Sequence, residues 1–265
     1  MDGLWTIAAI VIGAGLCSPI GGFIATRFSP STLLLSITVG FAGGILIGTA
    51  SFEMIPTALE RIAVWLVVPA VVLGMLLTYG LDMFVNKGQL AGDEADQKPR
   101  VDSFHRRHRP RGTMVTVLAA ATDFAAAATA AEELIEGLSI GVGGSLGGAT
   151  ALVVGIAIAI DNLSEAMSIG SLARKEDDKS HVRRTLMWTG LIGLSLMVAG
   201  LGGWALLRNV PVEVLAFLLS VGAGAMLYLT TTDLLPSAEE NQYQQSAAIA
   251  VTGGFLTALV LSQVS

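Results

Sequence analysis

EELIEGLSIG at residues 132–141 and DNLSEAMSIG at residues 161–170 decide the fold of this chain. The two stretches align at a constant offset of 29 residues, and an acid, a Glu, a Ser, an Ile and a Gly coincide between them. Each lies in a run of apolar residues long enough to cross a bilayer core, which needs about 20 residues of helix. The sequence therefore predicts two membrane-spanning helices that carry the same acidic motif.

The rest of the chain is equally apolar. Of its 265 residues 53% are hydrophobic and only 14% are charged, far below the proportion in a soluble domain. The 15 Lys and Arg residues against 21 Asp and Glu leave a net charge of −6, so no basic excess is available to bind nucleic acid. We predict one all-α integral membrane domain over residues 1–265, and expect its eight helices near residues 4–26, 30–55, 62–85, 112–140, 145–173, 185–207, 211–234 and 243–263.

The basic residues are unevenly divided between the connections of these helices. All but two of the 15 Lys and Arg residues follow the odd-numbered helices, and only Arg61 and Arg208 fall on the opposite side. Because cytoplasmic loops carry the excess of Lys and Arg, both termini are expected outside the cytoplasm. We expect a multi-pass protein of a prokaryotic cytoplasmic (plasma) membrane.

The longest connection, residues 88–111, is polar and cannot bury a core of its own. It is expected to be a flexible cytoplasmic loop. Its basic end includes His105 and His108, which could hold a metal transiently. The favoured interpretation is solvated charge that fixes the topology and contacts anionic lipid.

A second internal repeat links the second and seventh helices at an offset of 180 residues. The coinciding pairs are Gly44 with Gly224, Glu53 with Asp233, Pro56 with Pro236, Ala58 with Ala238, and Glu60 with Glu240. In both repeats one helix is even-numbered and the other odd-numbered, so the paired helices run in opposite directions. This is typical of inverted-topology repeats with a site near the midplane, although chance similarity between Gly/Ala-rich helices is the alternative for the second pair.

The polar residues of helices four and five are too costly to face lipid. An acid at a helix centre costs roughly 2.5–3.5 kcal/mol, so five would cost on the order of 12–18 kcal/mol. Residues four apart lie one turn above each other, which directs these side chains into a common space between two antiparallel helices. So many close carboxylates cannot all ionise without a cation, and the alternative is a set of protonated carboxyls that bridge the helices. The predicted metal ligands are Glu132, Glu133, Glu136, Asp161, Asn162 and Glu165.

With these motifs the sequence resembles the ZIP family of divalent metal transporters. The resemblance implies eight helices, termini outside, a long cytoplasmic loop after helix three, and a metal site formed by His-Asn-x-Pro-Glu-Gly motifs in helices four and five. In this chain Glu132 and Asp161 stand at the histidine positions. Glu133 and Asn162 take the asparagine positions, and Glu136 and Glu165 the glutamate positions. The resemblance also extends to the segments around Glu53 and Asp233 in helices two and seven.

The chain departs from the family pattern in ways that affect the chemistry. Ile135 and Ser164 replace the motif prolines, so these helices lack the residue that would unwind them. Residues 189–193 of helix six carry no carboxylate, so the second metal site of the family is not expected to be complete. Oxygen ligands favour manganese or ferrous iron, whereas the family resemblance favours zinc or iron, and zinc also accepts carboxylates. The expected substrate is thus a divalent cation, Zn, Fe or Mn, and no cofactor is expected.

Further acids lie outside the two acidic motifs. Glu53 and Asp233 are expected at the outer and inner mouths, where they would concentrate cations, whereas Glu60 is interpreted as ordinary interfacial charge. Asp123 lies about 180° around the helix from Glu132 and is not expected to be a ligand. An enzyme is not expected, because an intramembrane protease would need a histidine and none is predicted in a helix. The alternative function is a cation channel or exchanger of another carboxylate-repeat family, and a homodimer is possible.

Overall fold

The computed structural model describes residues 2–85, 111–174, 181–239 and 243–263, and within these ranges it is helical throughout, without a strand. The long helices are α1 (Asp2–Arg27), α2 (Thr32–Thr49), α4 (Val64–Val85), α6 (Arg111–Leu146), α7 (Gly148–Arg174), α8 (His181–Leu207), α9 (Val212–Leu229) and α11 (Gln244–Ser262). Short elements extend two of them: η1 (Ala50–Met54) and α3 (Ile55–Leu59) follow α2, and η2 (Thr230–Leu234) and α10 (Leu235–Glu239) follow α9.

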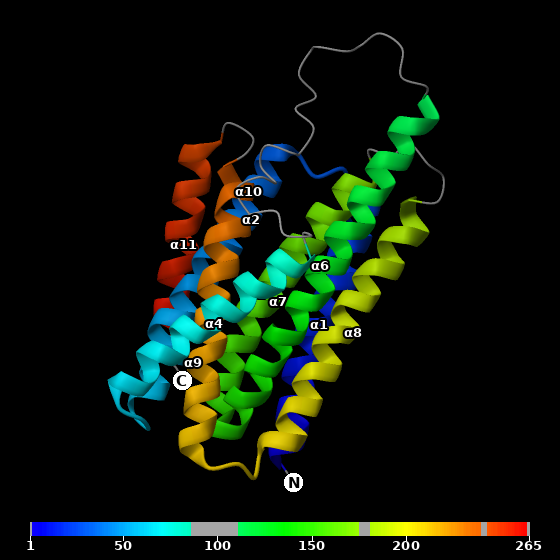
Figure 1. The fold of residues 1–265 in the computed structure, drawn as a ribbon. Coiled ribbons are helices and arrows are strands. Elements are labelled where there is room, and N and C mark those ends of the chain that lie inside the picture. Colours follow the sequence, from blue (N-terminus) through cyan, green and yellow to red (C-terminus); the bar gives the residue numbers. More distant parts are fainter. Residues whose placement is uncertain (1, 86–110, 175–180, 240–242, 264–265) are drawn as a thin grey trace.

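Seven of the described helical segments are long and apolar enough to cross a membrane. The eighth long helix is α6, whose 36 residues include Asp123 and the acidic motif. Figure 1 shows the long helices running alternately up and down the bundle. The predicted all-α membrane fold is confirmed. The expected loop at residues 88–111, with His105 and His108, lies almost entirely outside the described residues.

Three helix boundaries differ from the sequence prediction in an informative way. The second and seventh helices were expected to end near residues 55 and 234, yet α3 and α10 continue them to Leu59 and Glu239. Each continuation follows a π-helical turn, and Pro56 and Pro236 come directly after these turns as the second residues of α3 and α10. Because proline has no N–H to donate, the regular helical hydrogen bonding is interrupted there. The sixth helix starts at His181 rather than near residue 185. A histidine therefore does occur in a helix, and the contrary expectation was wrong.

The offset of 180 residues reappears in the backbone of the two halves. Adding 180 to the bounds of α2, η1 and α3 gives the bounds of α9, η2 and α10, and α4 and α11 begin at Val64 and Gln244. Their packing repeats as well, because α11 packs on α2 as α4 packs on α9. A Cβ at Gly44 would collide with the Val251 carbonyl oxygen, and one at Gly224 with that of Val71. Each half thus needs a glycine at the same close helix crossing.

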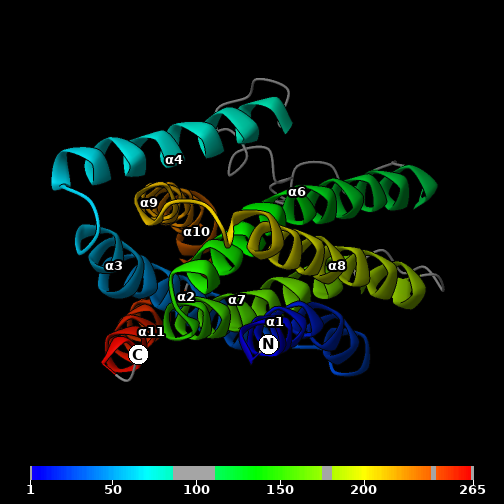
Figure 2. The same ribbon diagram turned by 90° about the horizontal axis from the view of Figure 1, so that it is seen from below.

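The helices form two groups that meet at the acidic motifs. Figure 2 shows α1, α6, α7 and α8 together on one side, and α2, α4, α9 and α11 on the other. Within the first group α6 packs on α8 and α7 packs on α1, while α2 packs on α7 and α9 packs on α6 across the boundary. The contact of α2 with α7 corresponds to the contact of α9 with α6, because the repeats relate α2 to α9 and α7 to α6. The polar faces of α6 and α7 consequently lie inside the bundle, away from lipid.

Candidate metal centre

Three carboxylates from three helices converge in the interior. One oxygen each from Glu132 of α6, Glu165 of α7 and Asp233 of η2 lie within 4.8 Å of one another. Glu132 and Glu165 are half-buried and Asp233 is exposed, so the cluster opens on one side. The π turn η2 adds a residue to its turn, which rotates the following positions by about 100° relative to a regular α-helix.

A divalent cation is a partner that such a cluster could hold. Three carboxylates at this spacing repel one another unless a positive charge lies between them. Carboxylate oxygens bind hard divalent cations and also zinc. From residue 132 to residue 165 the sequence contains no Lys, Arg or His, so this stretch of α6 and α7 supplies no positive charge of its own.

Glu133 and Asn162 form a separate pair on the α1 side of the motifs. In the amide orientation that satisfies its neighbours, the Asn162 nitrogen donates to Glu133 Oε2 at 3.2 Å and to Ser18 Oγ at 3.3 Å. Glu133 and Asn162 are each 1% exposed. These two positions correspond to each other at the offset of 29, so the pair bridges α6 and α7 across the repeat.

Glu136 and Asp161 lie one helical turn away from the cluster. They are four residues from Glu132 and Glu165 respectively, about 6 Å along the helix axes. Glu136 is 4% exposed and Asp161 is 2% exposed. Among the described residues, Glu136 Oε2 and Asp161 Oδ1 have no hydrogen-bond partner. Buried carboxylate oxygens are rarely left in this condition without a ligand.

The structure therefore divides the six sequence-predicted ligands into three pairs. Glu132 and Glu165 join Asp233, Glu133 pairs with Asn162, and Glu136 and Asp161 lie one turn deeper. Asp233 was expected at a mouth of the path, and sequence reasoning missed it as a ligand. The signal that could have found it was the repeat, which aligns Asp233 with a second acid, Glu53, in a membrane helix. At Ile135 and Ser164 the backbone of α6 and α7 stays helical.

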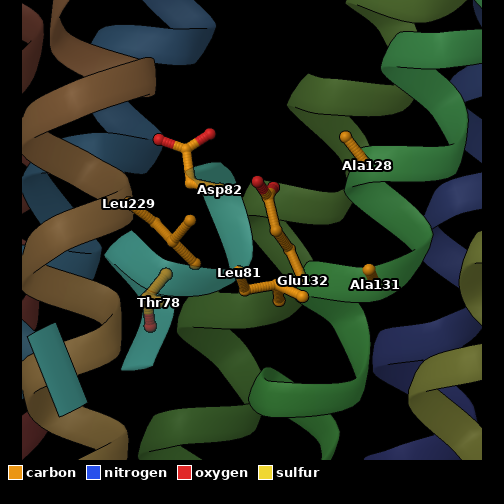
Figure 3. Close-up of a pocket in the computed structure, with 7 residues that line it drawn as sticks. All are labelled: Thr78, Leu81, Asp82, Ala128, Ala131, Glu132 and Leu229. Atoms are coloured by element: carbon orange, nitrogen blue, oxygen red, sulfur yellow. The ribbon is translucent and has the colours of Figure 1, made fainter. Parts of the chain in front are cut away.

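A small pocket adjoins the cluster between α4, α6 and α9. Its walls are Thr78, Leu81, Asp82, Ala128, Ala131, Glu132 and Leu229. Figure 3 shows Glu132 and Asp82 directing their carboxylates into the same space from α6 and α4. Tyr228 donates a hydrogen bond of 2.8 Å from its hydroxyl to Asp82 Oδ2, which fixes the Asp82 carboxylate. Asp82 is thus a further acid beside the cluster.

Asp123 has a different partner, in agreement with the expectation that it is not a ligand. Arg184 Nε and Trp188 Nε1 each donate to Asp123 Oδ1 at 2.7 Å, and Arg184 contacts Asp123 Oδ2 at 2.7 Å. This bidentate pair joins α6 to α8.

Comparison with known proteins agrees with this architecture. No family model matches the chain. The chain is 25% identical over 236 residues to the zinc transporter ZupT of Escherichia coli O7:K1 (strain IAI39 / ExPEC), an alignment that covers 87% of this chain and 86% of that protein. The zinc transporter ZupT of Escherichia coli O1:K1 / APEC matches with the same identity and coverage. The predicted resemblance to the ZIP family is confirmed by this similarity to zinc transporters, which extends over most of both chains.

Proposed function

We propose that this protein carries divalent transition-metal cations, Zn, Fe or Mn, into the cytoplasm through a carboxylate-lined path near the membrane midplane. The observation that carries the proposal is the convergence of Glu132, Glu165 and Asp233 within 4.8 Å inside a membrane-spanning bundle. The metal is the substrate, and no cofactor is needed for its passage. Two zinc transporters among the relatives support zinc as a substrate.

The wider path contains all six sequence-predicted ligands. In this proposal Glu132, Glu136, Asp161 and Glu165 bind the ion in turn, while Glu133 and Asn162 hold α6 and α7 in register. The hydrogen bond from Asn162 to Glu133 supports the positioning role. An oxygen-rich path accepts Mn²⁺ and Fe²⁺ as well as Zn²⁺, because none of its ligands is a soft sulfur or imidazole group.

The cluster faces the cytoplasm in this proposal. Almost all Lys and Arg residues of the chain fall on one side of the predicted topology, and Asp233 lies toward that side, two turns before its helical segment ends at Glu239. Asp233 is exposed there, and Asp82 lines the pocket next to Glu132. These two acids would receive the ion as it leaves the midplane. The corresponding location is the cytoplasmic membrane of a prokaryote, with both termini outside and a homodimer as the working unit.

Uptake into proteoliposomes tests the proposal. Purified protein is reconstituted and offered Zn, Mn, Fe, Co, Cd, Mg and Ca in turn, with the metal content of the vesicles as the readout. We expect uptake of transition metals above protein-free vesicles, and loss of that uptake in Glu165→Gln. Glu213→Gln, at an exposed position in the first turn of α9, is the matched control and should transport normally. Well-folded protein that passes none of the metals would refute the proposal, and preference for Mg or Ca would favour the channel or exchanger alternative.

A further inference from the structure

An apolar groove lies between the two groups of helices. Residues of α4 and α9 line it from one group, and residues of α6 and the last residue of α8 line it from the other (Figure 2). Its volume is about 240 Å³, against about 20 Å³ for the pocket beside Glu132. Along α6 the lining extends from Ile135 to Val142, which is about 10 Å at 1.5 Å per residue. The groove thus follows much of one leaflet, whose hydrocarbon is roughly 15 Å thick.

The lining of the groove offers nothing that a polar ligand requires. Its polar residues are Thr78 and Ser139, and the other lining residues are Gly, Ala, Val, Leu and Ile. Each of the two hydroxyls already donates a hydrogen bond of 3.0 Å within its own helix, Thr78 to the Gly74 carbonyl oxygen and Ser139 to that of Ile135. A Cβ at Gly74 would collide with the Val221 carbonyl oxygen, so the groove does not continue between α4 and α9. Its shape and chemistry therefore suit an apolar chain that lies along the surface.

The groove opens to the hydrocarbon of the bilayer. Leu77 of α4 and Leu138 of α6 belong to its lining and are 58% and 44% exposed. Three of the helices that line it, α4, α8 and α9, are long and apolar enough to cross a membrane. Because the bilayer core contains no water, an acyl chain is the molecule that reaches an apolar groove at this depth.

A positive charge lies at one end of the groove. Leu207 lines the groove, and the next residue, Arg208, is exposed. The guanidinium carbon of Arg208 lies 5.1 Å from the centroid of the Trp204 ring, a cation–π contact of the kind that holds an arginine in place. Tryptophan is typical of the membrane interface, where lipid headgroups lie. In the part of the chain that the structure describes, no carboxylate forms an ion pair with Arg208, so its N–H donors are open to an anion.

We propose that this groove binds a phospholipid, with one acyl chain between α4 and α6 and its phosphate group at Arg208. A guanidinium matches the geometry of a phosphate and binds it through two parallel hydrogen bonds. The acyl chain alone would be replaceable by any other apolar chain, so the phosphate contact is what makes the site selective. The bound lipid would contact both groups of helices at once. The inference concerns the lipid and holds whichever ion the protein carries.

Native mass spectrometry of the full-length protein in detergent tests the phosphate contact. Dioleoyl phosphatidylglycerol is titrated into the protein, and dioleoylglycerol, which has the same chains without the phosphate, is the matched lipid. We expect one tightly bound phosphatidylglycerol, and an affinity about tenfold lower for dioleoylglycerol and for Arg208→Gln, because a hydrogen-bonded charge is lost. Arg61→Gln removes the other exposed basic residue on this side of the predicted topology and should bind as wild type does.

Fluorescence quenching tests where the acyl chain lies. Leu138→Trp adds a reporter in the groove, and Leu194→Trp adds one at a 51% exposed position of α8 outside the lining. Phosphatidylglycerol with brominated chains should quench the fluorescence added by Leu138→Trp over the concentration range of binding, and that added by Leu194→Trp only at severalfold higher concentration. Equal affinity of Arg208→Gln and Arg61→Gln, equal affinity for the two lipids, or equal quenching at the two positions would overturn the site.

Discussion

The two halves of the molecule share a backbone but not the exposure of their acids. The segments α2–η1–α3 and α9–η2–α10 have bounds that match at an offset of 180 residues. Glu53 in the first half is 5% exposed, whereas its counterpart Asp233 is exposed. The repeat therefore determines where each acid lies along its helix, and the packing around it determines whether the acid can be reached. Under the proposed topology the half with Glu53 is the outer half and covers its acid, whereas the half with Asp233 is the inner half and leaves its acid exposed.

Aromatic packing also differs between the two halves. Phe52, next to Glu53, stacks edge to face on Phe255 of α11 with ring centroids 4.8 Å apart. The corresponding residues of the inner half are Thr232 and Met75, which form no aromatic pair. An aromatic pair of this kind contributes about 0.5–1.5 kcal/mol in addition to the free energy gained by burying its apolar surface. The pair holds η1 against α11 in the outer half. In the inner half the aromatic pair is Tyr228 of α9 on Tyr79 of α4, with ring centroids 6.2 Å apart, and Tyr228 precedes η2 by two residues.

The largest expected effect comes from neutralising one acid in each half of the path. Glu165→Gln and Glu136→Gln occupy corresponding positions at the offset of 29, and Gln keeps the shape while removing the charge. Loss of a charged ligand should reduce metal uptake by about tenfold or more in each variant. Uptake into proteoliposomes measures both, with Glu213→Gln as the control. A normal rate in Glu136→Gln alongside an inactive Glu165→Gln would confine the path to the inner half.

The next effect concerns access to the two related acids. In a Cys17→Ser background, Asp233→Cys should react with a water-soluble maleimide several-fold faster than Glu53→Cys, because only Asp233 is exposed. Adding Phe52→Thr, which gives the outer half the residue of the inner half, should speed labelling of Glu53→Cys. Labelling is followed by mass spectrometry, with denatured protein as the measure of full reactivity. Equal initial rates at the two positions would contradict the covered position of Glu53.

The sequence predicted the fold and both repeats but could not predict this asymmetry. Helix number, order and approximate bounds follow from the spacing of charges in an apolar chain, since each span needs about 20 residues. The π turns were missed because nothing in the local sequence distinguishes them from regular helix. Asp233 was assigned to a mouth rather than to the cluster for the same reason, since its direction depends on η2. Exposure depends on contacts between distant segments, such as Phe52 with Phe255, which periodicity does not reveal.

Metal preference provides a smaller effect, and it involves one residue from each of the two acidic motifs. Glu132 and Asp161 correspond at the offset of 29 and occupy positions where the family resemblance implies histidine. Replacing both with His introduces two neutral, softer ligands and removes two negative charges, which should raise the Zn/Mn transport ratio by a few-fold. Competition between the two metals in wild-type and variant vesicles measures the ratio. An active double variant with an unchanged or lower ratio would show that selectivity arises elsewhere.

The smallest expected effect concerns the ion pair between Asp123 and Arg184, which has no counterpart at the corresponding positions of the repeat. Asp123 binds Arg184 through both carboxylate oxygens and also accepts from Trp188, which joins α6 to α8. The corresponding residues of the other half, at offsets of 29 and 180, are Leu152 and Leu4, which are 49% and 45% exposed. One end of the bundle thus has an ion pair between Asp123 and Arg184, here called the clasp, whereas the corresponding residues at the other end are exposed leucines.

Arg184→Lys keeps the charge of this clasp but loses the planar, bidentate contact with Asp123. The Asp123 side chain is 47% exposed, so solvent weakens the pair, and we expect a loss of stability of about 1 kcal/mol or less. Arg183→Lys, at the exposed neighbouring position, should leave stability unchanged. Thermal unfolding in detergent, followed by tryptophan fluorescence, measures both variants. Metal uptake should survive in each, because α6 and α8 also pack through close contacts such as that of Gly137 with the Leu196 carbonyl oxygen. Equal melting of the two variants would show that the bidentate contact between Arg184 and Asp123 contributes no stability.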